Sequence, residues 1–315
     1  MKIIDIDELR PLLHRGKVIE AVRQALIWQA QGKVQSPLPG QLLFRQPPGD
    51  CHIKYGHVAG ASHFAIKVAT GFYDNPKLGL PSNQGLILVF DAQTGVPTLL
   101  LKDDGWLTAW RTAAATAVAA STLGPAEVTM VGVIGTGLQA SLALEWLPDT
   151  LGDKPFVVWG RDHDKAVTLA GEASLAGRRV IAVEHVAELL ERCNVVVTAT
   201  PSAMPLFTAD QVQSGTHIVA LGADSPGKQE LPAELFRRAS IILTDDHAQC
   251  VDHGDFGTAV RAKAVADNAD VMLGHVLAGT VKPSRHPSSI TVVDLTGIAA
   301  EDIAIAGVFS QMLKV

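Results

Sequence analysis

An apolar run that ends in a glycine-rich turn and leads directly into a helical pattern constrains the fold of this chain most strongly. The run is Val128–Ile134, and the turn reads Gly135-Thr136-Gly137-Leu138-Gln139-Ala140. Gly135 permits a tight turn, Gly137 lets the backbone approach a bound group, and Ala140 allows close packing of helix on strand. Because free N–H groups at a helix N-terminus bind phosphate, this context predicts a parallel α/β unit that binds the pyrophosphate of a dinucleotide.

From Glu127 onward, apolar strand-like segments alternate with helical segments, which is typical of a parallel sheet covered by helices. The expected strands are Val128–Ile134, Phe156–Trp159, Val180–Ala182, Asn194–Thr198, His217–Leu221, Ile241–Thr244 and Thr291–Leu295. The pattern predicts a Rossmann-type unit.

The first third of the chain has a different pattern, in which a helix precedes short strands joined by turns. The helix is expected over Lys17–Gln31, and the strands over Gln41–Arg45, His52–His57, Phe64–Thr70, Gly85–Phe90 and Pro97–Lys102. A long helix over Trp106–Leu123 leads into the next region, and a closing helix over Ala300–Met312 can return to the first.

Composition narrows the class of protein. The chain has 315 residues, 47% of them hydrophobic and 18% charged, so it has ample material for a core. A net charge of -6 without basic runs argues against nucleic acid as a partner. Three cysteines in no metal or disulfide spacing, an acidic start and the lack of a long apolar segment predict a reduced, cytoplasmic protein that does not enter a membrane.

The end of the second parallel strand bears on the choice of dinucleotide. NAD-binding units place an acidic residue there, which accepts a hydrogen bond from the ribose 2′-hydroxyl. Here Phe156–Trp159 is followed by Gly160, Arg161 and Asp162. A small residue followed by an arginine suits the 2′-phosphate of NADP, so NADP(H) is favoured over NAD(H). The alternative is a solvated Arg161 with Asp162 on the ribose.

Three cations in apolar settings indicate an anion site. Arg45 ends an apolar strand, Lys67 interrupts another, and Arg111 opens the alanine-rich helix. A substrate carboxylate is the simplest anion that they would bind; a snorkelling side chain is the alternative for each one alone. Asp224 follows the strand His217–Leu221, where it can exchange a proton with a substrate, or merely cap a turn.

The sequence also contains a cluster of Asp, His and Cys residues, which we do not interpret as a metal site. Its members are Asp245, Asp246, His247, Cys250, Asp252, His253 and Asp255. Their spacing matches no zinc motif, and a polar loop is the interpretation adopted.

Four blocks together resemble the ornithine cyclodeaminase and mu-crystallin family over nearly the whole chain. They are Thr108–Ala114, Gly135–Ala140, Gly222–Leu231 and Gly297–Asp302. The resemblance implies a Rossmann-type domain over residues 116–299, inserted into an α+β substrate-binding and dimerisation domain built from residues 1–115 and 300–315. It also implies a homodimer.

The same resemblance assigns roles to individual residues. It implies that Arg45, Lys67 and Arg111 bind the substrate carboxylate and that Asp224 is the acid/base at the reacting C–N bond. Thr112, Thr136 and Gln139 would contact the cofactor phosphates. Lys54 aligns where ornithine cyclodeaminases carry an acid for the distal amine, and a cation there should repel that amine.

The family's chemistry is hydride transfer at an α-carbon that bears nitrogen. Lys54, the Gly160-Arg161 pair and the segment Phe64–Tyr73 favour its ketimine reductases, which reduce Δ1-pyrroline-2-carboxylate or Δ1-piperideine-2-carboxylate to the cyclic L-amino acid. Ornithine cyclodeaminase, an amino-acid dehydrogenase and a non-catalytic binding protein are the alternatives.

Overall fold

The computed structural model describes residues 1–72 and 74–313 of the chain, and these form two compact units. The first unit spans Met1–Thr112 and Ile298–Val315, and the second spans Ala113–Gly297. The expected fold class is confirmed, since a Rossmann-type unit interrupts a unit built from both chain ends. Tyr73, at the end of a segment used in the comparison with ketimine reductases, lies outside the described residues.

A mixed sheet forms the framework of the first unit. Its strand order is β1-β7-β6-β5-β4-β2, with β3 also paired to β4. Only the β1–β7 pair is parallel among the described strands. The strands are β1 (Lys2–Asp5), β2 (Val34–Gln35), β3 (Gly40–Arg45), β4 (Pro48–Val58), β5 (His63–Phe72), β6 (Asn83–Asp91) and β7 (Pro97–Lys102). The sequence pattern predicted all of these except β1 and β2.

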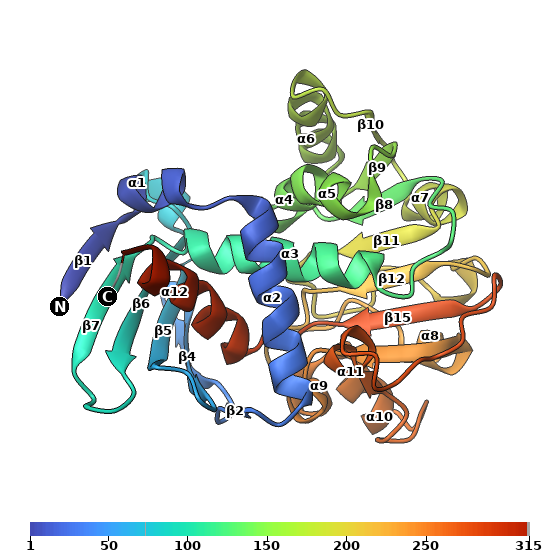
Figure 1. Cartoon of the computed structure of the whole chain (residues 1–315). Coiled ribbons are helices and arrows are strands. Elements are labelled where there is room, and N and C mark those ends of the chain that lie inside the picture. The colour runs from blue at the N-terminus through green and yellow to red at the C-terminus, as the bar shows by residue number, and fades with distance from the viewer. Residues whose placement is uncertain (73, 314–315) are drawn as a thin grey trace. The chain divides into compact units, whose positions relative to one another are not determined.

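Two layers of helix cover one face of this sheet. The C-terminal helix α12 (Ala299–Leu313) packs on β4, β5 and β6, and α2 (Arg15–Ala30) packs on α12 (Figure 1). The short α1 (Ile6–Leu9) contacts β1 and β7, and α3 (Trp106–Ser121) begins in this unit. Every residue of α12 from Ala299 to Gly307 is buried. A helix that is apolar on all sides fits this position between a sheet and another helix.

The opposite face of the sheet is apolar and partly open. Tyr55 is 46% exposed, and Ile66 and Leu88 on the neighbouring strands are half-buried. Phe64 and Phe90 stack across β5 and β6 with ring centroids 4.8 Å apart. On β3, the side chains of Leu43 and its neighbours are exposed.

The second unit contains a parallel sheet in the order β10-β9-β8-β11-β12-β15-β13-β14. Val195, Val196 and Val197 on β11 are all fully buried, so helices cover both faces. The strands are β8 (Val131–Ile134), β9 (Phe156–Trp159), β10 (Val180–Ala182), β11 (Val195–Thr198), β12 (His217–Ala220), β13 (Ala239–Thr244), β14 (Val271–Met272) and β15 (Ile290–Asp294). The helices are α4 (Leu138–Trp146), α5 (Pro148–Leu151), α6 (His163–Leu175), α7 (Val186–Arg192), α8 (Ala233–Arg238), α9 (His247–His253), α10 (Asp255–Arg261) and α11 (Leu273–Leu277).

The strand order of this sheet positions a ligand site. The chain runs from β8 to β9 on one side and later returns to β11 on the other side of β8. Such a reversal leaves a crevice beyond the carboxyl ends of the strands, where ligands of open α/β sheets bind. The glycine turn that follows β8 therefore lies at this crevice.

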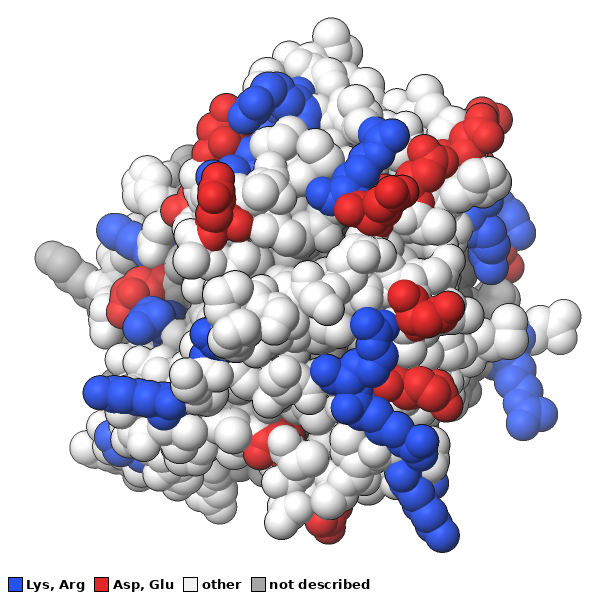
Figure 2. All heavy atoms as spheres, turned by 90° about the vertical axis from the view of Figure 1, so that its right-hand side faces the viewer, with Lys and Arg blue, Asp and Glu red and all other residues white. Residues whose placement is uncertain are grey.

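The surface carries charges of both signs. Lys and Arg side chains lie among Asp and Glu side chains over the face shown in Figure 2. In the part of the chain that the structure describes, no helix has the length and hydropathy of a membrane span.

Candidate active-site residues

The glycine turn of the second unit has the geometry of a pyrophosphate cradle. Gly135 adopts a φ of 134°, and a Cβ there would lie 2.6 Å from the carbonyl oxygen of Ala199. Gly137 is the N-cap residue of α4, and a Cβ on it would meet no atom within 4 Å. Packing therefore requires the first glycine, whereas the second leaves space before the free N–H groups of α4. That space suits a phosphate group.

The other residues predicted to contact the dinucleotide differ in their burial. Ala140 is fully buried at the close approach of α4. Thr136 and Gln139 are half-buried on the turn. Leu138, also predicted here, is 51% exposed. Thr112 belongs to the first unit, where its hydroxyl donates to the Thr108 carbonyl over 2.9 Å.

Packing at the end of β9 explains why Gly160, one of the three residues used to distinguish NADP from NAD, is a glycine. A Cβ on Gly160 would lie 2.4 Å from Cγ2 of Thr136, so this glycine is needed for packing against the turn. Asp162 is the N-cap of α6, and its carboxylate accepts from the Lys165 N–H over 3.3 Å. Arg161 is exposed beside them.

A buried cluster of opposite charges lies in the first unit. Lys54 and Lys67 are register partners on β4 and β5 and are both buried. The Lys67 Nζ atom lies 3.1 Å from Oδ2 of Asp302 on α12. Arg111 on α3 pairs with Glu301 over 2.9 Å and with Asp302 over 3.4 Å. The structure thus brings Lys54, Lys67 and Arg111 together around two carboxylates.

Burial is the main electrostatic effect in this cluster. The pKa of Lys67 is lowered to about 7, mainly by burial and also by the Arg111 and Lys54 cations, against the opposing effect of Asp302. The Asp302 carboxylate therefore does not offset the effects of desolvation and of the two neighbouring cations on the pKa of Lys67. Asp103, before α3, accepts from the Leu107 N–H over 2.8 Å, and burial raises its pKa to about 6. A further anion beside the Lys67 ammonium would raise the pKa of Lys67 again.

Arg45 does not join this cluster in the structure. It lies at the exposed end of β3, opposite Pro48 of β4. No ion pair of Arg45 is found among the described residues. The apolar run before it reads as a buried strand, but β3 pairs only with β4 and leaves Leu42, Leu43 and Phe44 exposed.

Asp224 lies on the loop that follows β12. Its side chain is 47% exposed, and its Oδ1 atom lies 2.6 Å from Nζ of Lys228 on the same loop. A hydrogen bond fixes the loop near its start, because the Gly222 N–H donates to Glu230 over 2.7 Å. Asp224 thus projects from the carboxyl edge of the parallel sheet, where a group that exchanges protons with a ligand would lie.

Buried carboxylates line the same edge, and sequence reasoning assigned them no role. Glu230, Asp245, Asp255 and Asp294 are almost completely buried. Burial is the largest cause that raises the pKa of each, and for Asp255 and Asp294 a neighbouring carboxylate raises it further. Backbone N–H groups bind them: Asp255 accepts from Glu230 and Leu231, and Asp245 accepts from Thr296 and Gly297.

The polar segment from Asp245 to Asp255 is explained by local structure. Asp246 caps α9 by accepting from the Gln249 N–H over 2.8 Å, and His247 contacts Asp270 over 2.8 Å. Within the described residues, no group of His, Cys, Asp and Glu side chains is arranged to hold a metal ion.

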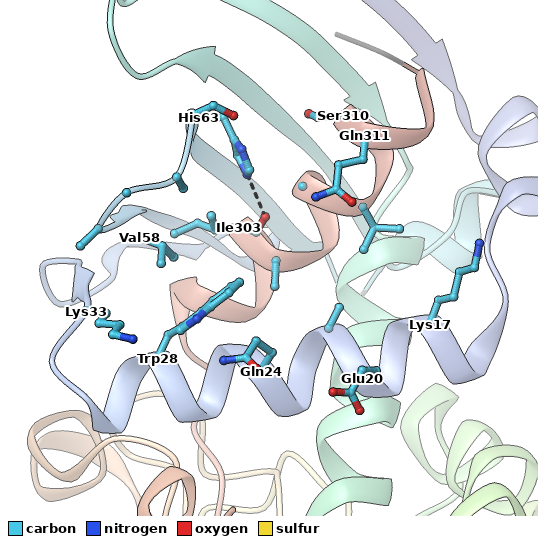
Figure 3. A pocket seen from close by; sticks show the side chains of 18 of the residues that line it. Lys17, Glu20, Gln24, Trp28, Lys33, Val58, His63, Ile303, Ser310 and Gln311 are labelled. Atoms are coloured by element: carbon cyan, nitrogen blue, oxygen red, sulfur yellow. Dashed lines mark hydrogen bonds between the residues drawn. The ribbon is translucent and has the colours of Figure 1, made fainter. Parts of the chain in front are cut away.

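A separate cavity of about 1000 Å³ opens in the first unit between α2, α12 and the β4–β5 turn (Figure 3). Trp28 projects into it from α2, and Ile303 and Gln311 line it from α12. His63 closes one side, with its Nε2 atom 3.4 Å from the Ile303 carbonyl oxygen. Asp302 precedes Ile303 on the same helix, so α12 has both the ion cluster and this cavity beside it.

Comparison with known proteins places these features in one family. The model of the ornithine cyclodeaminase/mu-crystallin family matches residues 4–314. An uncharacterised cyclodeaminase of Sinorhizobium fredii is 35% identical over 312 residues, covering 97% of this chain and 94% of that relative.

Two solved structures are similar along the whole chain. An archaeal alanine dehydrogenase dimer with bound NAD has a TM-score of 0.90 at 30% identity, covering 99% of this chain and 97% of the other. The Δ1-pyrroline-2-carboxylate reductase of Thermococcus litoralis, in complex with NADH and L-proline, has a TM-score of 0.92 at 26% identity, covering 100% of this chain and 98% of the other.

Proposed function

Because this chain belongs to the ornithine cyclodeaminase/mu-crystallin family, we propose that it reduces a small cyclic ketimine carboxylate to the cyclic L-amino acid. The family comprises NAD(P)-dependent enzymes, reductases and cyclodeaminases among them. Δ1-Pyrroline-2-carboxylate and Δ1-piperideine-2-carboxylate are the proposed substrates, and NADPH is the proposed reductant.

The buried cation cluster carries this proposal. The lowered pKa of Lys67 means that a second anion near Lys54, Lys67 and Arg111 would restore the charge of the ammonium. A substrate carboxylate supplies that anion. A diamino acid such as ornithine would add a distal ammonium beside the Lys54, Lys67 and Arg111 cations, so the cluster favours a cyclic imine over a cyclodeaminase substrate.

Each proposed role follows from the chemistry of its residue. Lys67 and Arg111, supported by Asp302 and Glu301, bind the carboxylate and orient the ring. Asp224 stabilises the protonated imine or relays its proton, because a protonated imine accepts hydride more readily. The nicotinamide supplies the hydride when bound. The glycine turn binds the cofactor pyrophosphate, and Arg161 binds the 2′-phosphate of NADP.

We also propose that the protein is a homodimer joined through the open face of the first unit's sheet. That face presents Tyr55, Ile66 and Leu88, and β3 adds exposed apolar side chains. An apolar surface of this kind is typical of an interface. The similar archaeal alanine dehydrogenase is a dimer.

An amino-acid dehydrogenase is a second candidate, favoured by the likeness to that alanine dehydrogenase. Nicotinamide absorbance during incubation with each cyclic imine and with pyruvate plus ammonia, together with assays of proline and ammonia after incubation with ornithine plus NAD, distinguishes the three reactions. We expect NADPH consumption with a cyclic imine. Turnover of pyruvate and ammonia alone, or release of proline and ammonia from ornithine, would refute the ketimine reductase.

The same assay tests Arg161 and Asp224. Arg161→Ala should raise KM for NADPH roughly tenfold, since a charge-assisted hydrogen bond contributes about 1.5 to 3 kcal/mol, and leave KM for NADH unchanged. Equal effects on both cofactors would remove the 2′-phosphate contact. Asp224→Asn should retain NADPH binding and lose most turnover, and a near-normal kcat would exclude Asp224 from proton transfer.

A further inference from the structure

Glu230 has an unusual environment at the carboxyl edge of the parallel sheet. Its side chain is fully buried, and none of the ion pairs found in residues 1–72 and 74–313 involves it. Its carboxylate instead accepts four hydrogen bonds. Thr198 Oγ1 donates to Oε2 over 2.6 Å, Thr200 N and Oγ1 donate to Oε1 over 2.6 and 2.8 Å, and Gly222 N donates to Oε2 over 2.7 Å.

These four donors come from the ends of two neighbouring strands. Thr198 ends β11 and Thr200 follows it, while Gly222 follows β12. Each carboxylate oxygen accepts from one hydroxyl and one backbone N–H. A single side chain thus fixes both loops and the spacing between them. Asp255 binds the backbone of Glu230, because its Oδ1 atom accepts from the Glu230 N–H over 2.9 Å.

Both loops contact or contain residues of the proposed site. The loop after β11 includes Ala199, whose carbonyl oxygen is the atom closest to a Cβ built on Gly135 of the cofactor turn. The loop after β12 carries Asp224. A Cβ on Gly222 would lie 2.0 Å from the Thr200 carbonyl oxygen and 2.5 Å from Cδ of Glu230, so the two loops are in close contact.

We propose that Glu230 is a positioning residue, whose carboxylate holds the Thr200 and Gly222 amides so that the cofactor turn and the Asp224 loop keep a fixed spacing. The inference rests on the proposed function for the meaning of Asp224. The reaction needs this spacing because a displacement of about 1 Å at a catalytic group can lower turnover by roughly 100-fold. Glu230 touches neither substrate nor cofactor in this role.

Glu230→Gln tests the proposal, because the change is nearly isosteric. A glutamine has one acceptor oxygen, so it can accept from the Thr200 N–H or the Gly222 N–H but not from both. We expect faster hydrogen exchange at one of these two amides, and kcat lowered by about 10- to 100-fold per NADPH-binding site, with KM for the imine nearly unchanged. The matched control is Glu234→Gln on the first turn of α8, where the side chain is exposed.

Three readouts separate positioning from loss of the fold. Counting active molecules by NADPH binding corrects for misfolded protein, and Glu230→Asp, which keeps both oxygens, should recover part of kcat. Unchanged kcat per binding site, or unchanged exchange at both amides, would overturn the proposal. If the wild-type protein reduces no imine, the proposed function fails. Exchange at Thr200 and Gly222 and the NADPH affinity of Glu230→Gln then decide the positioning role without a substrate.

Discussion

The two units bury charge in opposite ways. In the first unit, Lys67 and Arg111 face Asp302 and Glu301, so both cations have a partner of opposite sign. In the second unit, burial raises the pKa of Asp255 and of Asp294, Glu230 raises the first further and Asp255 the second, and the hydrogen bonds found for the two aspartates come from backbone N–H groups. Ion pairs create a potential that a ligand can alter, whereas carboxylates bound to amides fix the positions of loops. In the proposed function, the ion pairs of the first unit belong to the binding site, and the carboxylates of the second unit fix loops around it.

Removing one ion partner should have the largest effect. Asp302→Ala leaves Lys67 without this carboxylate and removes one of the carboxylates that pair with Arg111, so we expect a loss of about 3 to 5 kcal/mol in the free energy of unfolding. Urea denaturation measures it. The control is Asp153→Ala, which breaks an exposed pair with Arg179 and should cost less than about 1 kcal/mol.

A double substitution sharpens this result. Lys67→Met with Asp302→Leu removes both charges and should cost less than Asp302→Ala alone, because no unpaired ammonium is left. A loss in the free energy of unfolding equal to the sum of the losses in Lys67→Met and Asp302→Leu would show that the pair is not coupled.

Titration of Lys67 should have the next largest effect. Its pKa is about 7, so the ammonium loses its proton as the pH rises above that value, and KM for a carboxylate substrate should rise up to about tenfold per pH unit. Lys67→Arg, which stays charged, should abolish the alkaline rise. A wild-type KM that is constant from pH 6 to 9 on this scale would exclude Lys67 from carboxylate binding.

The lowered pKa of Lys67 also makes the stability of the fold depend on pH in a defined direction. Folding lowers the pKa of Lys67 from 10.5 to about 7, so the unfolded chain binds the additional proton between these values. The contribution of Lys67 to stability therefore increases as the pH rises through this window.

Removing one of the clustered carboxylates of the second unit should have the smallest effect. Asp294→Asn keeps an oxygen for the Phe256 N–H and removes a like charge near Asp255, so the free energy of unfolding at neutral pH should change by less than about 1 kcal/mol. Exposed Asp267→Asn is the control. A loss as large as that of Asp302→Ala would mean that the two units do not differ in this way.

Local patterns predicted most elements but not their long-range pairing. The run Pro97–Lys102 forms β7 with the expected bounds. The short strand β1 is not predicted because Lys2 and Asp5 interrupt its apolar character, and its partner Leu99 lies far along the chain. The insertion of β15 between β12 and β13 likewise depends on packing of the whole unit.

The candidate site shows the same limit. Lys67 and Arg111 were recognisable as cations in apolar segments, but their partners Glu301 and Asp302 lie near the other end of the chain. A pair of carboxylates in an otherwise apolar helix is the signal that could have identified them. Arg45 had the same local signal as Lys67, yet β3 lies outside the main path of the sheet and leaves it exposed. The roles of all the predicted site residues, Lys67 and Arg111 included, stay predictions.

The complete burial of α12 from Ala299 to Gly307 has a consequence for how this chain can vary. Most surface helices can exchange residues freely on one side, but this segment has no such side. His63 atoms lie 3.0 to 3.1 Å from a Cβ built on Gly307, so even alanine there needs a shift of the ring. In a deep mutational scan, this C-terminal segment should therefore be among the least tolerant of the chain, although chain ends commonly accept change.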